Sequence, residues 1–132
     1  MFASLFVLLY IGHLLADYPL QTDHQATHKA DRSAAGWAAN LRHATTHVVT
    51  CTAALTVGAV VLDDVALSAP MVLAALLWIG ASHALIDRRW PVQWWMNHTG
   101  QTSWAANGGA AHVDQTAHVL ALALAALALA AG

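Results

Sequence analysis

The chain has 132 residues and a formal net charge of −2; 58% of its residues are hydrophobic and 9% are charged. A soluble domain carries about 25% charged residues, so this composition excludes an ordinary water-facing surface and indicates a protein surrounded by lipid. The small net charge and the lack of a basic patch with interleaved aromatic residues argue against a nucleic-acid partner. The length predicts one domain over residues 1–132, and the lone Cys51 excludes an intramolecular disulfide.

Four apolar stretches predict four transmembrane helices. They cover about residues 2–17, 37–62, 70–87 and 111–131. No positively charged segment precedes the first stretch, so we expect it to be retained rather than cleaved as a signal peptide. Pro19 stops the first helix, because the residue before a proline disfavours the helical region. Pro70 suits the first turn of the third helix.

Two longer polar connections join these helices. The first, residues 19–36, is compatible with a short amphipathic helix at the membrane surface. The second, residues 88–110, holds four tryptophans, and tryptophan prefers the membrane–water boundary, so we expect it to lie along the lipid headgroups. We interpret the histidines outside the helix interiors as surface residues, with lid or extra-ligand roles as the alternatives. They are His24, His28 and His98. His112, two residues before Asp114, would face away from that residue on a helix and could contribute only from an unwound helix end.

Each predicted helix carries two metal-capable side chains four residues apart. The pairs are His13 and Asp17, His43 and His47, His83 and Asp87, and Asp114 and His118. Residues with this spacing share one face of a helix. The pairs lie near the C-terminal ends of the first and third helices and near the N-terminal ends of the second and fourth. Helices that run up, down, up and down therefore bring all four pairs to one side of the membrane.

This pattern predicts an all-α integral membrane four-helix bundle with a shared polar site. All the basic residues fall on the side of that site, and they are Lys29, Arg32, Arg42, Arg88 and Arg89. Asp63 and Asp64 fall on the other side. The positive-inside rule then predicts a protein of the bacterial inner-membrane type, with the site facing the cytoplasm and both termini outside.

The pairs predict a centre for a divalent transition metal. Imidazole and carboxylate ligands favour zinc, with iron or manganese as alternatives. Eight candidate ligands allow two ions, or one ion whose imidazole ligands are oriented by the remaining carboxylates. A bound cation would also stabilise Asp17 and Asp87, because the helix dipole disfavours an acidic residue near a helix C-terminus. The alternative is that the pairs are polar helix ends that only fix helix register.

Three stretches carry a family resemblance. Residues 13–21, 82–87 and 112–118 read HLLADYPLQ, SHALID and HVDQTAH. The chain resembles, over most of its length, the small bacterial and phage membrane proteins of domain-of-unknown-function family 3307. The resemblance implies a polytopic membrane protein without an established reaction. It also implies that Lys29 corresponds to a lysine that many members carry after the first motif.

For the function, we predict a metal-dependent membrane hydrolase that acts on a lipid-linked or headgroup substrate. Asp114 is the predicted general base, and Arg88, Arg89 and Gln115 are the predicted substrate-binding residues. The alternatives are a non-enzymatic metal-binding or transport subunit, a phage protein acting on the host envelope, and an oxidative di-iron enzyme. The lipid bilayer is the expected partner in every case, and the sequence leaves the oligomeric state open.

Overall fold

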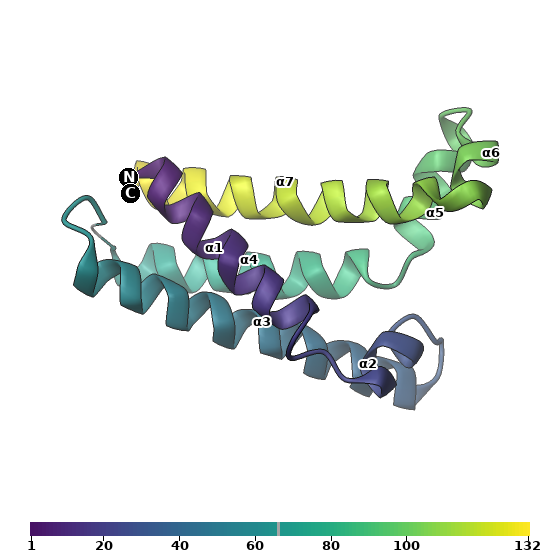
Figure 1. Ribbon diagram of the computed structural model, residues 1–132, viewed down its shortest axis with the longest axis horizontal. Helices are drawn as coiled ribbons and strands as arrows, with labels where there is room; N and C mark the ends of the chain where they lie inside the picture. Colours follow the sequence, from purple (N-terminus) through teal and green to yellow (C-terminus); the bar gives the residue numbers. More distant parts are fainter. Residues whose placement is uncertain (66) are drawn as a thin grey trace.

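The computed structural model describes residues 1–65 and 67–132 (Figure 1). These residues form helices and no strand, which confirms the predicted all-α class. The elements in chain order are α1 (Phe2–Asp17), α2 (Asp23–His28), α3 (Ala34–Val61), α4 (Ala69–Ile86), α5 (Trp90–His98), α6 (Thr102–Trp104), the π-helical turn η1 (Ala105–Gly109) and α7 (Ala110–Ala131).

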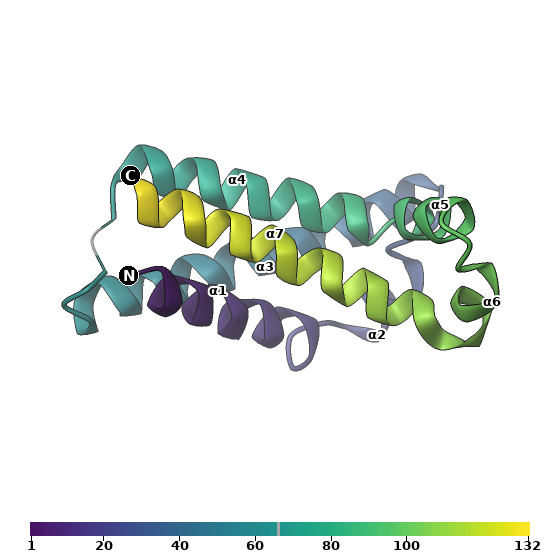
Figure 2. The same cartoon turned by 90° about the horizontal axis from the view of Figure 1, so that it is seen from above.

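The four long helices pack side by side. Helix α1 contacts α3 and α7, and α4 contacts the same two helices. They run alternately along the long axis of the molecule, so that both termini lie at one end (Figures 1 and 2). Helix α3 begins at Ala34 rather than near residue 37, because the Ser33 hydroxyl accepts a hydrogen bond from the Gly36 amide at 3.0 Å and caps the helix.

Each long helix turns one buried stripe toward the others. In α3 the stripe recurs every three or four residues, as expected of one helix face. Its members are Gly36, Ala39, Asn40, His43, Ala44, His47, Thr50, Cys51, Leu55 and Gly58. Toward the chain termini the stripes of the four helices are apolar, and among their largest residues are Leu5, Leu9, Leu55, Ile79, Leu122 and Leu129. Toward the opposite end the same stripes carry histidine.

Helices α1 and α3 come very close at Gly12. A Cβ atom at this position would lie 3.0 Å from the Cys51 Cα, closer than side chains normally approach backbone. Small residues permit this kind of contact between membrane helices. The contact matters for the site, because His13 is the next residue of α1 and is brought close to α3 by it.

Three helical stretches are long and apolar enough to cross a membrane: α3, α4 and Thr102–Ala131. Helix α1 is apolar but has only 16 residues. We predicted four transmembrane helices, and three helical stretches meet the length and hydropathy expected of one. All four long helices nonetheless expose large apolar side chains on their outer faces, and Val7, Val57, Leu77 and Leu124 are each more than half exposed.

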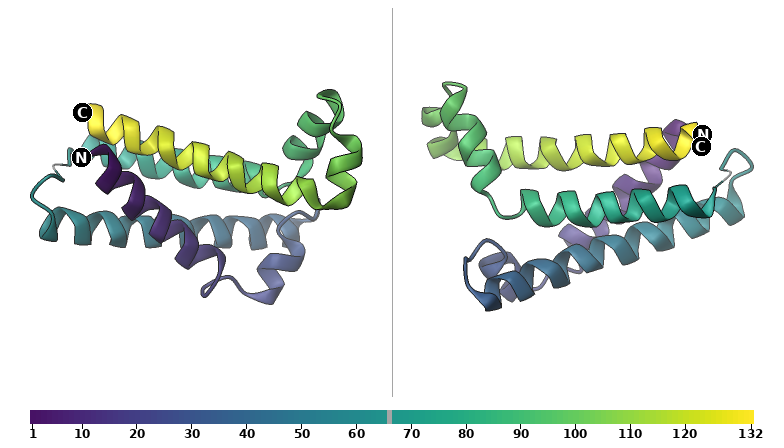
Figure 3. Two further views of the ribbon diagram at one scale, coloured as in Figure 1. Left: turned by 45° about the horizontal axis from the view of Figure 1, so that its top comes forward. Right: turned by 180° about the vertical axis from the view of Figure 1, so that it is seen from behind.

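Both connections contain helices, as expected for the first and beyond what was expected for the second. The 19–36 segment contains the short helix α2, and the tryptophan-rich segment folds into α5, α6 and η1. Both lie at the end of the molecule opposite the termini (Figure 3). Gly108, with a φ of 96°, turns the chain from η1 into α7. The predicted short connection between α3 and α4 includes residue 66, which lies outside the described residues.

Candidate metal centre

Histidines from all four long helices meet between the apolar core and the end opposite the chain termini. The ring centroid of His83 lies within 5.6 Å of those of His13, His43, His47 and His118. All five side chains are buried, and so is Asp87, the residue that follows α4. Buried polar side chains normally have partners, so the contacts within this cluster decide what it can do.

A first group with metal-binding geometry consists of Asp17, His43, His47 and His83. Asp17 Oδ1 lies 3.1 Å from Nε2 of both His43 and His47. The two Nε2 atoms lie 3.3 Å apart, and His83 Nε2 is 4.0 Å from Asp17 Oδ1. Ligand atoms of a tetrahedral ion with bonds of about 2.0–2.1 Å lie roughly 3.3 Å from one another. Three of the four atoms already have that spacing.

Hydrogen bonds and a bound cation are both compatible with this crowding. His43 Nε2 has Gln21 Nε2 at 2.8 Å in addition to the Asp17 oxygen and the His47 nitrogen. An imidazole nitrogen either donates one hydrogen or accepts through one lone pair. Gln21 can donate to His43 Nε2 while His47 Nε2–H donates to Asp17 Oδ1, so hydrogen bonds can satisfy these four atoms, and one cation could instead bind several of them together.

The second group consists of His83, Asp87 and His118. His83 Nε2 lies 3.1 Å from Asp87 Oδ2 without the direction of a hydrogen bond, and His118 Nε2 lies 3.9 Å from Asp87 Oδ1. In the described part of the chain, five buried side-chain atoms lack a hydrogen-bond partner. Three of them are His83 Nε2, Asp87 Oδ2 and His118 Nε2. Each such atom costs about 1–3 kcal/mol, and a bound cation would satisfy all three, so this donor set fits a metal ion.

Two further predicted ligands orient members of these groups. His118 Nδ1 lies 3.0 Å from the Asp114 carbonyl oxygen and 3.4 Å from Asp114 Oδ2. An Nδ1–H donated to this carbonyl leaves the Nε2 lone pair free for a metal, as in many metal sites. His13 Nε2 lies 3.0 Å from Asp17 Oδ2, the oxygen that does not face His43 and His47. The structure thus brings six of the eight predicted ligands into the two groups and places His13 and Asp114 behind them.

Asp87 has a cationic partner in Lys29. The Lys29 ammonium lies 2.9 Å from Asp87 Oδ1, and both side chains are largely buried. Burial raises the pKa of the Asp87 carboxyl, but the adjacent His83 ring and the Lys29 charge outweigh it and hold that pKa well below its usual range. Asp87 is therefore ionised at neutral pH, as a metal ligand must be.

Lys29 is held in place from two sides. Helix α2 begins with a capping box in which the Thr22 and Gln25 side chains each bond to the other residue's backbone amide. Behind Lys29, the Arg88 guanidinium donates to the Lys29 and Asp31 carbonyl oxygens at 2.9 and 2.7 Å. The same guanidinium lies 4.1 Å from the Trp37 ring centroid.

A cavity of about 520 Å³ adjoins the cluster at Asp87. Its polar lining consists of Gln21, Lys29, Asp87, Arg89, Gln93 and Asp114. Of the three predicted substrate-binding residues, Arg89 lines this cavity, whereas Arg88 does not. Gln115 instead lies beside the cluster, with its Nε2 3.4 Å from His13 Nε2.

The family model described as "Protein of unknown function (DUF3307)" matches residues 5–131. The chain belongs to the DUF3307 family. This confirms the resemblance that the three motifs indicated, and the match includes every residue of both groups. No curated protein and no solved structure gives a significant match. For this DUF3307 protein the site geometry is therefore the basis for any statement about function.

Three residues near the cluster do not belong to any of the four pairs with a spacing of four residues. They are Gln21, Lys29 and Asn40. Gln21 is the last residue of the first motif, Lys29 was indicated through the family resemblance, and Asn40 was not indicated. Asn40 is fully buried, and its Nδ2 donates to the Ala84 carbonyl oxygen at 3.2 Å, which joins α3 to α4. The remaining histidines lie outside both groups. His24, His98 and His112 are exposed, and His28 Nδ1 lies 2.8 Å from Asp31 Oδ2.

Proposed function

We propose that this protein is an integral membrane protein whose His/Asp cluster binds one or two divalent transition-metal ions. One observation carries the proposal: the buried atoms without hydrogen-bond partners are concentrated in His83, Asp87 and His118, which form one of the two groups with metal-binding geometry. A chain that buried these atoms for packing alone would lose several favourable interactions at one place. Nitrogen and oxygen ligands of this kind favour zinc, with iron or manganese as alternatives.

Two ions fit the ligand set if His83 serves one of them. The Nε2 lone pair of His83 can bind a single ion, although His83 belongs to both groups. Asp17, His43 and His47 would then hold a first ion, and His83, Asp87 and His118 a second. Three protein ligands beside an open cavity are typical of catalytic zinc sites, whereas closed four-ligand sites are structural. The second position is therefore the better candidate for chemistry.

We further propose a four-helix membrane bundle with the metal centre at the cytoplasmic face of a bacterial inner membrane and both termini outside. All five basic residues belong to the end of the molecule that holds the cluster, in agreement with the positive-inside rule. Five half-exposed tryptophans belong to the same end: Trp37, Trp90, Trp94, Trp95 and Trp104. Helix α1, about 24 Å long at 1.5 Å per residue, would be the fourth span where the bilayer is locally thin.

As the reaction we propose metal-dependent hydrolysis of a lipid-linked or headgroup substrate. The support is the cavity, which opens beside Asp87 and brings a second carboxylate, Asp114, to its wall. A bound divalent ion supplies Lewis acidity at this wall. Asp114 is partly exposed and would accept a proton from the attacking water as general base. Lys29 holds Asp87 ionised and oriented.

Metal content of the purified protein tests the centre. Elemental mass spectrometry of the detergent-purified chain is expected to find one or two transition-metal ions, and a His83→Ala, His118→Ala double variant is expected to lose the ion that His83, Asp87 and His118 would hold. His98→Ala, which removes an exposed histidine outside both groups, is the matched control and keeps the bound metal. A wild-type protein that stays metal-free after reconstitution, beside a double variant that melts at the same temperature, would overturn the proposal.

Headgroup release from phospholipid nanodiscs tests the reaction. Asp114→Asn is expected to lower kcat by about 10²- to 10⁴-fold, the usual contribution of general base catalysis, without loss of metal. If the metal-loaded wild-type protein releases no headgroup from zwitterionic or anionic lipids, the non-enzymatic alternative of a metal-binding subunit holds instead.

A further inference from the structure

We propose that the cavity beside Asp87 binds a phosphate-class anion and that Arg89 recognises it. The inference rests on the proposed metal centre, since it names the chemical class of the group that approaches that centre. A phosphate-class anion could be the headgroup phosphate of a lipid or a free phosphate. Both present the same oxygens to the protein, and the experiment below separates them.

The cavity collects hydrogen-bond donors from separate parts of the chain. Lys29 comes from the end of α2, Arg89 from the corner between α4 and α5, and Gln93 from α5. Gln21 lies on the same wall and reaches His43 in the metal cluster at 2.8 Å. Guanidinium, ammonium and amide groups are the donors that hold phosphate oxygens in proteins.

Arg89 is the cation of this cavity that remains available. Lys29 is paired with Asp87, whereas the Arg89 side chain makes no hydrogen bond or ion pair with any residue in 1–65 or 67–132. The planar fork of an arginine matches two oxygens of a phosphate, whereas a lysine ammonium acts as a point charge. The free fork of Arg89 is thus the group that would discriminate a phosphate from a smaller anion.

The backbone supports a role for the Arg89 side chain. Arg89 has a φ of 62°, in the left-handed region, and no other non-glycine residue among those described has a positive φ. Its amide donates to the Ile86 carbonyl oxygen at 2.9 Å and closes the corner after α4. Glycine would fill this corner with less strain. A strained side-chain-bearing residue at a functional corner is a pattern associated with ligand contacts.

The charge balance of the cavity favours an anion once a metal is bound. Its ionisable lining has two positive groups, Lys29 and Arg89, and two negative groups, Asp87 and Asp114. Asp87 is committed to Lys29 and to the second metal position, and a divalent ion there makes the surroundings net positive. A cationic ligand would meet the ion, the ammonium and the guanidinium together and would be repelled.

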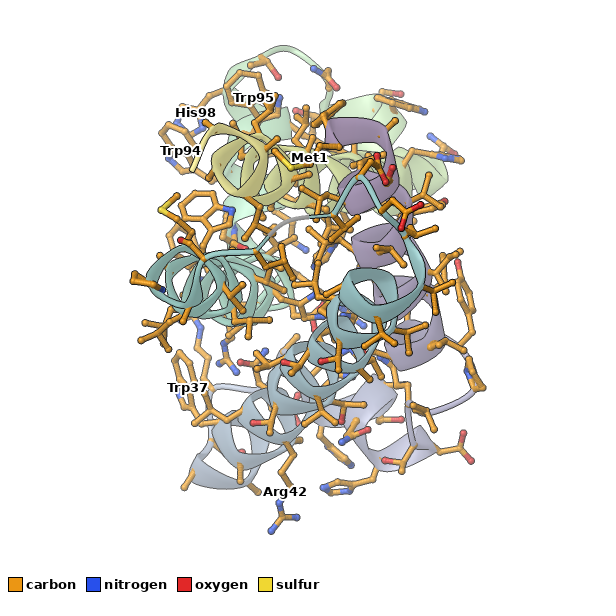
Figure 4. The ribbon with its side chains drawn as sticks, turned by 90° about the vertical axis from the view of Figure 1, so that its left-hand side faces the viewer. Met1, Trp37, Arg42, Trp94, Trp95 and His98 are labelled. Carbon is orange, nitrogen blue, oxygen red and sulfur yellow. The ribbon has the colours of Figure 1, made fainter. Side chains whose placement is uncertain are left out.

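The test compares two arginine substitutions at the same end of the molecule. Arg89→Gly removes the guanidinium and relaxes the left-handed backbone, so a folding defect is not expected. Arg42→Gln is the matched control, because Arg42 is exposed, lines none of the cavities described and projects away from the helices (Figure 4). Both variants lose one positive charge. Binding is measured by calorimetry on metal-reconstituted protein in phosphatidylcholine nanodiscs, with inorganic phosphate and with short-chain phosphatidic acid as separate probes.

Arg89→Gly is expected to weaken binding of at least one probe by about 10- to 100-fold, the effect of losing a charge-assisted contact, while Arg42→Gln leaves it within about twofold. Binding of phosphatidic acid alone identifies a lipid headgroup as the source, and binding of both probes identifies the phosphate group itself. The inference is overturned if neither probe binds, if Arg89→Gly binds as the wild type does, or if Arg42→Gln weakens binding equally. Metal content is measured on the same samples, so a metal-free wild type would contradict the metal centre separately from the Arg89 comparison.

Discussion

The two ends of the helix core continue the same buried stripes with opposite chemistry. In α1 the stripe passes from Leu5 and Leu9 to His13, and in α4 it passes from Ala75 and Ile79 to His83. Near the termini the core consists of leucine, isoleucine, valine, alanine and cysteine. At the other end the same helix faces bring imidazoles and carboxylates together.

The apolar end and the polar end are stabilised by different interactions. Lipid chains are as apolar as leucine, so burying apolar side chains between membrane helices yields little transfer free energy and close packing stabilises the contact. The apolar end meets this condition with small residues such as Ala125 and Ala126. The polar end contains buried atoms that lack partners. We therefore expect the apolar end to be stable by itself and the polar end to depend on a cation.

Metal removal is expected to produce the largest effect. Chelation of the purified protein should lower its thermal midpoint, because a ligand that binds only the folded state at about 1,000 times its Kd contributes about 4 kcal/mol. His83→Ala, which removes a ligand of the second position, should show a smaller shift on chelation than the wild type. Intrinsic tryptophan fluorescence during heating measures both. An unchanged wild-type midpoint after verified metal loss would mean that the polar end does not depend on a cation.

Substitution of Lys29 should come next. Lys29→Met leaves the buried Asp87 carboxylate without its 2.9 Å partner, and loss of one member of a buried pair costs about 3–5 kcal/mol. The metal-free protein should therefore lose more stability than the metal-loaded protein, in which the ion also neutralises Asp87. Thermal melts with and without zinc measure the difference. The exposed Arg42→Met is the control, and equal losses in both metal states would count against an ion at Asp87.

A smaller effect is expected from the contact between α1 and α3. Gly12→Ala places a methyl group 3.0 Å from the Cys51 Cα, and overpacking of this kind costs about 1–3 kcal/mol. Since α1 carries Asp17 into the cluster, metal affinity should fall as well. At Gly80 an added Cβ meets only the Val48 Cγ2 methyl, which can move. Competition with a zinc-sensitive dye should show weaker binding for Gly12→Ala than for Gly80→Ala.

The smallest effect is expected at the apolar end. Asp64 is exposed and accepts a hydrogen bond from the Ser4 hydroxyl at 2.7 Å. Contacts between exposed groups contribute little to stability. Asp64→Asn should therefore leave metal content and the thermal midpoint within experimental error. A loss of metal in this variant would mean that the two ends are coupled through the helices and that metal binding depends on the packing of the apolar end.

Local sequence determined the helices and the pairs. Apolar runs of sufficient length predict helices, and a spacing of four places His83 with Asp87, or His43 with His47, on one face. The pairs alternate between C-terminal and N-terminal helix ends, which indicates that all four lie at the same depth along the bundle axis. The helical repeat and the lengths of the connections are properties of the local sequence, so both can be predicted without the tertiary structure.

Only the tertiary structure decided which side chains form each group and what surrounds them. Asp17 joins histidines of α3 and α4, whereas Asp114, in an equivalent pair, contacts His118 of its own helix through its carbonyl and carboxylate oxygens and lines the cavity. Lys29 and Gln21 reach the cluster from the connection between α1 and α3. Helix rotation, the close contact at Gly12 and the path of the α2 segment depend on packing between residues distant in sequence. No local pattern specifies those distances, so they follow only when all the helices are assembled.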